Sequence, residues 1–379
     1  MTSAWKLEAE GWERSPSCIG GGSYGSIYEA RKQSDQNDQE KFVMKLLRSE
    51  TNDYKKNIKA LEREVDGLKK SHESGARVPK YIDHYPKSND TDTPEPKFFL
   101  VQQYIEGENL STKPGADDEK QIFTYLIDLL ETLHLIHKNG ILHRDIKPQN
   151  IIINKQAKDR NKCLYLVDFG ACKLLDYNLK SDELGGLESR KQDVTRPIIR
   201  TDSYAPPEIL VKVYRENQPE EYFLQDFVQN DSITKYLQAR DIYSLGMTIC
   251  DLIYKKMPKP IIDNDDNSDE RLRIPSCKKW TDAMKEVRNL APNIYCIVDK
   301  MLRYYPDERY QTAIEVLLDA STQAWYTYDQ EDFWLLQEKF LQDARNCQIP
   351  KTKQHEIFLN KSREKKRQDM MEKNIERLS

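Results

Sequence analysis

The sequence predicts an α+β fold in which a smaller, strand-rich part with one helix precedes a larger, mainly helical part. Two observations support this prediction. Up to about residue 105, short apolar runs alternate with polar or Gly- and Pro-containing segments, as in strands. From about residue 117 to residue 325, apolar residues recur mainly at helical spacing. A chain of 379 residues suits two modest domains or one large two-lobed unit, and it can bury a core without disulfides or metal ions.

The strand-rich part is predicted to contain strands at Ile27–Tyr28, Phe42–Leu47 and Phe98–Ile105. Residues 57–70, between the second and third of these strands, have the pattern of a helix. Apolar side chains recur there at spacings of three and four and therefore share one helical face: Ile58, Leu61, Val65 and Leu68.

The helical part opens with an apolar stripe over residues 123–136, and Asn139–Gly140 is a typical signal for the end of that helix. Short apolar runs follow, the first two strand-like and the last two suited to buried helices: Ile151–Asn154, Leu164–Val167, Cys250–Ile253 and Ile314–Leu318.

The composition argues against several classes of protein. Lys and Arg number 59 against 63 Asp and Glu, and a net charge of −4 does not suit a nucleic-acid partner bound by strong positive charge. The seven Cys are scattered without a CxxC pair, as expected for reduced thiols in the cytoplasm. The N-terminal residues lack the apolar core of a signal peptide, and no run of 18 apolar residues occurs. We therefore expect a cytoplasmic protein without membrane insertion.

A glycine-rich segment is the first feature that carries chemistry. Gly20-Gly21-Gly22-Ser23-Tyr24-Gly25 fits the pattern G-x-G-x-x-G, and Ile27 follows two residues later. Glycines let a backbone approach phosphate oxygens closely. The same pattern occurs in dinucleotide sites, where it opens a helix. The strand-like SIYEA after the glycines favours a hairpin lid instead.

The second feature is Lys45, which lies inside the apolar run 42–47. A lysine in a strand usually faces solvent, so this residue means little by itself. Glu64, on the predicted helix, could however hold the ammonium group beside phosphates as a point charge.

The third feature is His143-Arg144-Asp145-Ile146-Lys147-Pro148-Gln149-Asn150, followed by Asp168-Phe169-Gly170 after a strand-like run. A hairpin of the two short strands between these segments would bring Asp145, Asn150 and Asp168 together. Two of these groups could then hold Mg²⁺, while the third accepts a proton from an attacking hydroxyl.

In their order and spacing these features match the protein-kinase signature set, and residues 12–325 resemble the eukaryotic-type Ser/Thr protein kinases, bacterial members among them. SYAPPE (203–208) resembles the A-P-E segment of that family, with Glu208 retained. By the same resemblance, Asp241 would tie down the catalytic loop from a buried helix, and Arg309 would pair with Glu208.

The resemblance implies a bilobal kinase fold with a small antiparallel β lobe that contains one helix and a larger, mainly α lobe. The β lobe would cover residues 12–105 and the α lobe residues 106–325, after an extension of residues 1–11. Residues 326–379 would form a charged, helical tail, which is either simply solvated or binds a partner or an anionic surface.

The resemblance also implies ATP and Mg²⁺ as cofactors, bound between the lobes, with Asn150 and Asp168 as the metal ligands. The expected nucleotide contacts are Gly20, Gly21, Gly22, Ser23, Tyr24 and Gly25 of the glycine segment, Ile27, Lys45, backbone groups of Gln103 and Tyr104, and Asn109 or Glu108 at the ribose.

For catalysis, the resemblance implies that the γ-phosphate of ATP passes to Ser or Thr hydroxyls of protein substrates, this chain included. Asp145 would orient the hydroxyl, Lys147 would steady the transferred phosphate, and Lys45 would contact the phosphates while Glu64 holds it. Thr201 would contact both Asp145 and Lys147. Lys147 and Thr201 are what point to Ser/Thr rather than Tyr acceptors.

Regulation is expected in the activation segment. A phosphate there could pair with Arg144, which precedes the expected base. Thr195 is the candidate site, with Ser189 as a second choice, although Thr195 could equally be an exposed loop hydroxyl. Cys172 and His143 are read as packing residues rather than as reactive groups.

Two other functions remain as alternatives. A pseudokinase or scaffold could bind partners through the long segment 209–240 or the tail, although we favour an ordinary surface insertion for that segment. The presence of every expected catalytic residue argues against a pseudokinase. A kinase of small molecules or lipids is the second alternative, and Lys147 with Thr201 argues against it.

Overall fold

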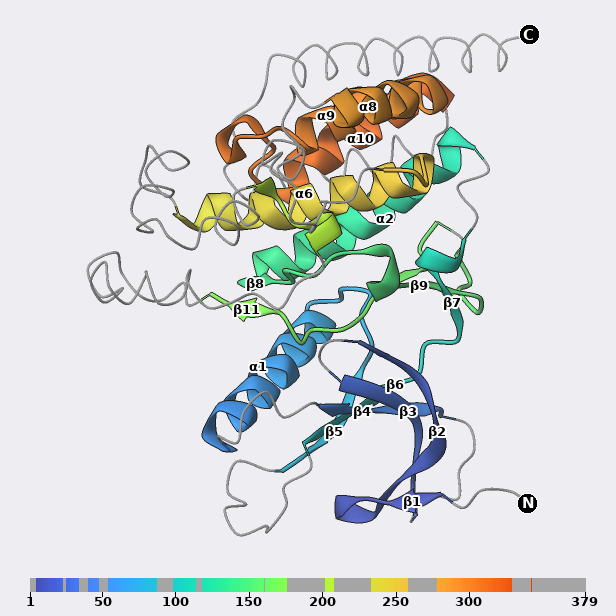
Figure 1. Ribbon diagram of the computed structural model, residues 1–379, viewed down its shortest axis with the longest axis vertical. Coiled ribbons are helices and arrows are strands. Elements are labelled where there is room, and N and C mark those ends of the chain that lie inside the picture. The colour runs from blue at the N-terminus through green and yellow to red at the C-terminus, as the bar shows by residue number, and fades with distance from the viewer. Residues whose placement is uncertain are drawn as a thin grey trace, which may run out of the picture.

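A computed structural model describes residues 5–22, 25–33, 40–47, 54–86, 98–113, 118–159, 161–175, 202–207, 233–257 and 278–328, together with Gln342. Figure 1 shows a sheet with one helix in the N-terminal part and packed helices in the C-terminal part, which confirms the predicted α+β class. Several expectations concern residues outside the described ones: Ser23, Tyr24, Ser189, Thr195, Thr201, Glu208, residues 209–232 and nearly all of the tail.

The N-terminal lobe contains an antiparallel sheet of six strands in the order β1-β2-β3-β4-β6-β5. Its strands are β1 (Lys6–Leu7), β2 (Trp12–Gly22), β3 (Gly25–Lys32), β4 (Phe42–Leu47), β5 (Tyr81–Tyr85) and β6 (Phe99–Gln103). The predicted strands at 27–28, 42–47 and 98–105 all lie in this sheet. Because Lys6 pairs with Arg14, the sheet begins inside the segment that the sequence assigns to an N-terminal extension.

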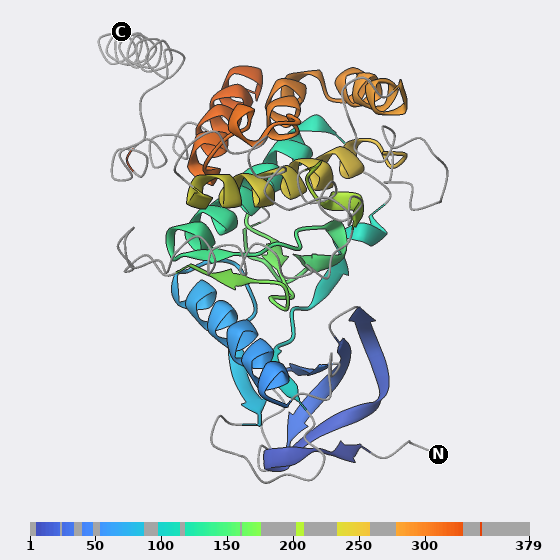
Figure 2. The ribbon, with the colours of Figure 1, turned by 60° about the vertical axis from the view of Figure 1, so that its left-hand side comes forward.

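Helix α1 (Tyr54–Glu73) is the predicted helix of this lobe and lies beside the sheet in both ribbon views (Figures 1 and 2). Its predicted apolar face is buried, with Leu61, Val65 and Leu68 each at most 2% exposed. This burial fixes which side of α1 faces the interior, and Glu64 is buried there with it at 2% exposure.

The C-terminal lobe is built around helices α2 (Glu119–Lys138), α6 (Ile233–Ile253), α8 (Lys278–Leu290), α9 (Pro292–Met301) and α10 (Ala313–Tyr328). The apolar stripe predicted for α2 is buried, and the helix ends at Asn139 and Gly140, where Gly140 has φ of +72°. Helix α6 already begins at Ile233, so the segment expected to be an insertion through residue 240 ends earlier, because residues 233–240 form the first turns of a core helix. Within the described parts of the chain, no helix is both long and apolar enough to cross a membrane.

Shorter strands and 3₁₀ helices complete the two lobes. They are β7 (Gly107–Asn109), β8 (Ile141–Leu142), β9 (Ile151–Asn154), β10 (Leu164–Leu166) and β11 (Lys173–Leu174), with short 3₁₀ helices at Ala9–Gly11, Leu110–Thr112, Pro148–Asn150, Asp202–Tyr204 and Pro306–Glu308. Strands β9 and β10 pair antiparallel, as the sequence predicts, and β11 pairs with β8. A Cβ atom on Gly107 would overlap the backbone carbonyl of Ile153, so only glycine allows β7 to lie this close to β9.

Candidate functional site

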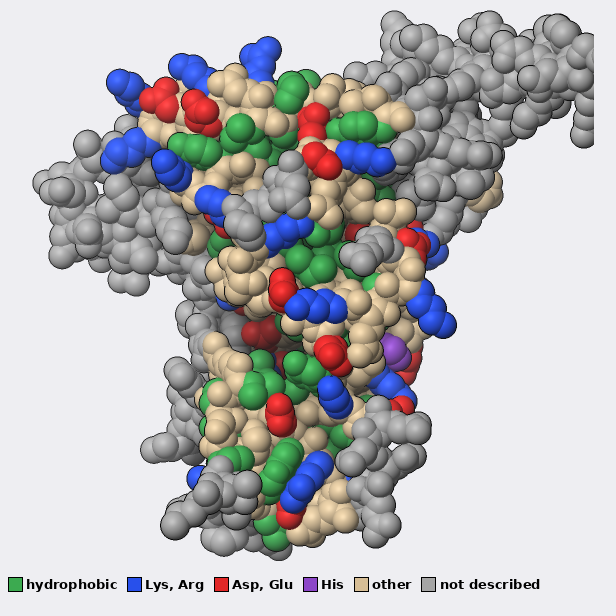
Figure 3. Space-filling model, turned by 90° about the vertical axis from the view of Figure 1, so that its right-hand side faces the viewer, with side chains coloured by type: hydrophobic (Ala, Val, Ile, Leu, Met, Phe, Trp, Pro, Cys, Tyr) green, Lys and Arg blue, Asp and Glu red, His purple; other side chains and the backbone are tan. Residues whose placement is uncertain are grey.

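A buried ion-pair cluster lies where the two lobes meet. Lys45 Nζ is 2.6 Å from Glu64 Oε1 and 2.6 Å from Asp168 Oδ1. The three groups come from β4, α1 and the segment after β10, which lie far apart in the sequence. Figure 3 shows the molecule hollowed between its lobes, with acidic side chains recessed in the hollow.

Burial and charge act in opposite directions on this cluster. Burial opposes the charge on Lys45, but the carboxylates of Asp168 and Glu64 outweigh it and raise the pKa of the ammonium above its ordinary 10.5. Burial likewise opposes ionisation of Asp168, and Lys45 outweighs it, so the pKa of Asp168 is lowered. For Glu64, burial prevails over the attraction of Lys45 and raises its pKa. The ammonium of Lys45 and the carboxylate of Asp168 thus each favour the charged form of the other.

The loop before β9 brings three further polar residues together. Asp145 Oδ2 accepts hydrogen bonds from Lys147 Nζ at 2.8 Å and from Asn150 Nδ2 at 3.0 Å. Asn150 Nδ2 also donates to the backbone carbonyl of Asp145 at 2.8 Å. Burial raises the pKa of Asp145 above the ordinary aspartate value of 3.8, although the charge of Lys147 acts to lower it. A carboxyl group whose pKa is raised in this way is suited to accept a proton.

Asp241 of α6 fixes this loop through hydrogen bonds. Its carboxylate accepts the backbone N–H of His143 and the backbone N–H of Arg144, each at 2.8 Å. Nε2 of His137, at the end of α2, lies 2.9 Å from the same carboxylate and donates to it, because an ionised carboxylate can only accept. Arg144 has φ of +68°, a conformation that costs energy for a side chain other than glycine, and these bonds maintain it.

Asp241→Asn is expected to lower the free energy of unfolding by about 3 kcal/mol, because an amide nitrogen would face a buried N–H group and leave it without an acceptor. Burial opposes ionisation of Asp241, but its hydrogen bonds outweigh burial and lower the pKa. The Asp241 carboxylate of the wild type therefore contributes fully to the free energy of unfolding at neutral pH. This contribution is lost as the pH falls below 3.8 and through the pKa of the folded state. Urea unfolding measures the change.

Asp299→Asn is the matched control. Asp299 pairs with Arg303 on the surface, and its side chain is 32% exposed. The same chemical change is expected to cost about 0.5 kcal/mol or less there. Equal unfolding free energies for the Asp241 and Asp299 variants would contradict the anchoring role of Asp241.

The segment that begins at Asp168 packs against the same loop. The rings of His143 and Phe169 meet edge to face with centroids 5.0 Å apart, and both side chains are buried. Burial lowers the pKa of His143, in keeping with a packing role. Asp168 itself has φ of +68°, and its carboxylate also accepts the N–H of Gly170 at 3.2 Å.

The glycine-rich segment forms the hairpin that the sequence predicts. Strands β2 and β3 pair antiparallel, with Gly22 opposite Gly25 and Gly20 opposite Ile27. Ile27 in turn lies opposite Lys45 on β4. A Cβ atom on Gly25 would overlap the backbone of β4, so glycine is required for the close approach at this point. The hairpin is thus attached directly to the strand that carries the buried lysine.

The connection between the lobes limits which backbone groups can meet a ligand. The N–H of Gln103 donates to the carbonyl of Lys80 and the N–H of Tyr104 to that of Lys41, both at 2.9 Å. The backbone N–H groups of both residues expected to bind adenine are therefore already hydrogen-bonded within the protein. Among the described residues the N–H of Ile105 has no such partner, and sequence reasoning missed it because no side chain marks a free backbone group.

The side chain of Asn109, expected at the ribose, is likewise engaged within the protein. Its Nδ2 donates to the carbonyl of Gln149 at 2.5 Å, and its Oδ1 accepts the N–H of Ser111 at 3.0 Å. Glu108, the alternative at the ribose, is 60% exposed and paired with Lys155. Each side chain keeps further hydrogen-bonding capacity beside these contacts, because an amide nitrogen has two N–H groups and a carboxylate has two oxygens.

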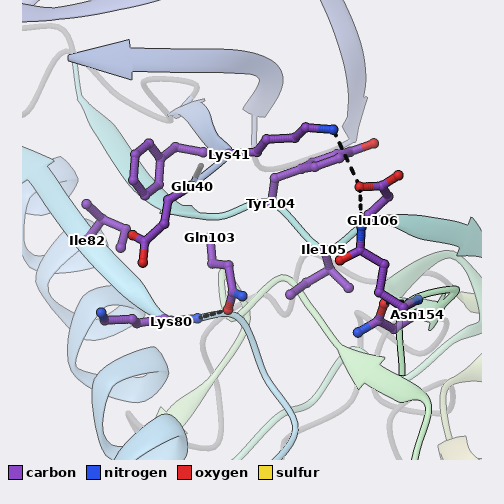
Figure 4. A pocket seen from close by; sticks show the side chains of 11 residues that line it. Glu40, Lys41, Lys80, Ile82, Gln103, Tyr104, Ile105, Glu106 and Asn154 are labelled. Atoms are coloured by element: carbon purple, nitrogen blue, oxygen red, sulfur yellow. Dashed lines mark hydrogen bonds and ion pairs between the residues drawn. The ribbon is translucent and has the colours of Figure 1, made fainter. Parts of the chain in front are cut away.

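A separate cavity of about 290 Å³ lies at the connection between the lobes (Figure 4). Lys41 pairs with Glu106 beside it at 3.4 Å, and Gln103 Oε1 accepts the N–H of Lys80 at 3.3 Å. The described residues that line it include neither Lys45 nor Asp145 nor Asp168. This cavity is therefore distinct from the buried cluster.

The described donor set suits a hard divalent cation bound together with phosphates. Asn150 uses its amide nitrogen toward Asp145, and its carbonyl oxygen has no partner among the described residues. This oxygen and the carboxylate of Asp168 are hard oxygen donors, the kind of group that Mg²⁺ prefers when phosphates supply further ligands. The described residues contain no group of three or more His, Cys, Asp and Glu arranged to hold a metal ion by themselves.

The structure thus brings Lys45, Glu64 and Asp168 into one cluster, and Asp145, Lys147 and Asn150 into a second. Arg309 donates to the backbone carbonyls of Arg303 and Tyr304, whereas its expected partner Glu208 lies outside the described residues. His137 was missed by sequence reasoning. Its place six residues before His143, at the end of the predicted helix, is the signal that could have found it.

Comparisons with known proteins agree with this geometry. A family model described as the protein kinase domain matches residues 14–320. The chain is 25% identical over 306 residues to "Serine/threonine-protein kinase PknA" of Nostoc sp., covering 79% of this chain and 45% of that protein. It is 27% identical over 300 residues to "Serine/threonine-protein kinase D" of Synechocystis sp., covering 78% and 49%. A 168-residue match to "Dual specificity protein kinase zakA" of Dictyostelium discoideum is 34% identical and covers 42% and 19%. The chain thus spans less than half the length of these relatives.

Proposed function

The chain belongs to the protein kinase family, and from this we propose that it transfers the γ-phosphate of MgATP to Ser and Thr hydroxyls of proteins, its own included. One observation carries the proposal: the buried Lys45–Glu64–Asp168 cluster and the Asp145–Lys147–Asn150 cluster occur together and are both complete. A scaffold that only bound partners would not need a lysine buried between two acids, because such burial costs free energy.

In the proposed reaction each side chain has a positional or electrostatic task. Lys45, held by Glu64, places a fixed positive charge beside the ATP phosphates. Asp145 accepts a hydrogen bond from the acceptor hydroxyl and takes its proton as the oxygen attacks the γ-phosphorus. The bond from that phosphorus to the oxygen of the β-phosphate breaks in the same step, and ADP leaves. Lys147, which already donates to Asp145, would also stabilise the charge on the transferred group. Positioning and charge stabilisation supply most of the acceleration, with turnover of about 1–100 s⁻¹.

Asn150 and Asp168 would hold Mg²⁺ in this proposal. When bound, Mg²⁺ supplies positive charge that neutralises the phosphates. Asp168 is ready for this role because its lowered pKa keeps it ionised. Adenine would meet the N–H of Ile105 and carbonyl groups near Gln103, since the N–H groups of Gln103 and Tyr104 are occupied.

The choice of Ser and Thr as acceptors rests on Lys147 beside Asp145 and on the names of the relatives. One relative is named as a dual specificity kinase, so the acceptor residue needs a direct test. The chain would be incubated with MgATP and casein, and with a panel of small alcohols, and the phosphate located by mass spectrometry. We expect phosphoserine and phosphothreonine on casein and on the chain. Phosphate only on a small alcohol, or only on Tyr, would overturn the proposed acceptor class.

The pH dependence offers a test of how Asp145 and Lys147 work together. Transfer requires ionised Asp145, so kcat falls as pH drops through its pKa. Lys147→Ala removes a charge that lowers this pKa, so the acid limb of the kcat profile should move to higher pH. We also expect kcat at the optimum to fall by about 10²-fold. The profile would be recorded at saturating MgATP from roughly pH 5 to 9.

Lys162→Ala provides the comparison, because Lys162 is exposed in the turn between β9 and β10. The titration of the ATP phosphates is common to both variants and to the wild type, so a difference between their profiles reports on the enzyme. An acid limb that stays in place in Lys147→Ala would rule out electrostatic coupling between Lys147 and Asp145.

The proposal extends to location and partners. The described cysteines Cys18, Cys163, Cys172 and Cys296 form no disulfide, which favours the reducing cytoplasm as the place of action. Protein substrates are the proposed partners. Docking of partners through residues 209–232 or the tail, and phosphorylation of Thr195, remain parts of the proposal that rest on the sequence alone.

A further inference from the structure

Helix α1 carries a buried glycine, Gly67, in its interior. Glycine at such a position destabilises a helix by roughly 0.5–1 kcal/mol relative to alanine, so its presence needs a reason. A Cβ atom on Gly67 would lie only 2.5 Å from Cys172 Sγ, whereas Phe169 Cδ1 and Cys172 Cβ would be at the ordinary distances of 3.5 and 3.6 Å. In the present arrangement, a side chain at this position would therefore collide with one sulfur atom.

Cys172 is fully buried and tied to both sides of the contact. Its Sγ lies 3.4 Å from the backbone carbonyl of Arg63 on α1, to which the thiol donates. Its N–H donates to the carbonyl of Phe169 at 3.0 Å, which closes a turn directly after Asp168. Burial raises the pKa of the Cys172 thiol to about 12, so the group keeps the proton that it donates.

Gly67 follows Glu64 by three residues, so the two positions lie on the same side of α1. Any side chain at 67 would meet the sulfur. Turning the buried thiol away about χ1 would break its hydrogen bond to the Arg63 carbonyl. Otherwise α1 or the segment 168–172 would have to move by about an ångström to restore ordinary contact distances. Either movement separates groups that now meet at 2.6 Å, because Glu64 belongs to α1 and Asp168 to the segment, and both hold Lys45.

We propose that the packing of the Cys172 sulfur against α1 at Gly67 sets the distance between α1 and the segment 168–172. Gly67 is then a positioning residue for Glu64 and Lys45. The proposal deepens, and rests on, the proposed kinase function of that cluster. It concerns a contact between one helix and one turn, and it follows from the shapes of these two residues in this chain.

Three variants test the contact. Gly67→Ala should lower kcat/KM for ATP by about 10²-fold, with KM for ATP raised and kcat reduced, because an ångström of misplacement suffices for such a loss. Cys172→Ala removes the sulfur and should have a modest effect. The double variant Gly67→Ala/Cys172→Ala should recover to within about threefold of Cys172→Ala, because the contacts that remain are ordinary ones.

Asp66→Ala serves as the matched control. Asp66 precedes Gly67 on α1 but is exposed, so the change raises helix propensity without touching Cys172. It should leave kcat and KM unchanged. Thermal unfolding with and without MgATP would be measured for every variant, which gives a readout besides activity: the rise in unfolding temperature caused by MgATP should shrink in Gly67→Ala and return in the double variant.

The outcomes separate this inference from the function on which it rests. Wild-type kcat and KM in Gly67→Ala, or a double variant as impaired as Gly67→Ala, would overturn the positioning role. A variant that loses thermal stability but keeps the wild-type KM for ATP would show a merely structural role and overturn it as well. If the wild type transfers no phosphate at all, the proposed function fails. The contact between Gly67 and Cys172 is then tested only by the rise in unfolding temperature that MgATP causes.

Discussion

Asp145→Asn is expected to lower kcat by about 10²- to 10⁴-fold, because an amide cannot accept the proton of the attacking hydroxyl. The side chain does not belong to the cluster that would contact phosphates, so MgATP should bind with nearly unchanged affinity. The fold should survive, since an amide oxygen still offers an acceptor to Lys147 and Asn150, which now donate to Asp145 at 2.8 and 3.0 Å. Steady-state kinetics and calorimetric titration with MgATP measure the two quantities.

Asp159→Asn is the control for this change. Asp159 lies in the exposed turn between β9 and β10, where its side chain accepts the N–H of Asn161 at 2.8 Å. Its variant should keep turnover within about twofold, because no reacting group is near it. If Asp145→Asn kept more than a tenth of the wild-type kcat, Asp145 would not be the acceptor of the proton.

Lys45→Met is the second change with a large expected effect. It removes the charge that compensates Glu64 and Asp168, both of which lie 2.6 Å from the ammonium. We expect transfer to fall by about 10²- to 10³-fold, because a fixed charge at the phosphates is lost. In contrast to Asp145→Asn, this variant should also bind MgATP more weakly, since both the lysine and the placement of Asp168 are disturbed.

The expected loss in Lys45→Met has a structural counterpart that can be measured without ATP. Asp168 would lose the partner that lowers its pKa. The free energy of unfolding should therefore fall less steeply with decreasing pH in the variant than in the wild type. Lys162→Met, a change in the exposed turn between β9 and β10, is the control and should alter neither activity nor the acid dependence. Normal transfer by Lys45→Met would mean that phosphate binding does not involve the buried cluster.

Much of the fold could be predicted from the sequence because the signals are local. The spacing of Leu61, Val65 and Leu68 places α1 and its buried face, and Asn139–Gly140 marks the end of α2. The order of the motifs around Lys45 and Asp145 pointed to the kinase family, which the match over residues 14–320 shows.

The remaining features depend on contacts between segments that are distant in the sequence. Strand β1 is two residues long and exposed, so no apolar pattern announces it. The use of the N–H of Tyr104 by Lys41 depends on how β4 meets the connection between the lobes. The role of Gly67 becomes visible only when Cys172, 105 positions further along the chain (172 minus 67), lies against it.

The central claim is that the two clusters, as they stand, form a site for phosphoryl transfer without help from another protein. The most direct test is the rate at which the purified chain transfers label from γ-labelled ATP to myelin basic protein at saturating Mg²⁺. We expect label that grows in proportion to time and to enzyme concentration, with a turnover of about 1–100 s⁻¹. Measurable binding of MgATP with no transfer above that of Asp145→Asn would contradict it, and would favour a protein that binds nucleotide and partners without catalysis.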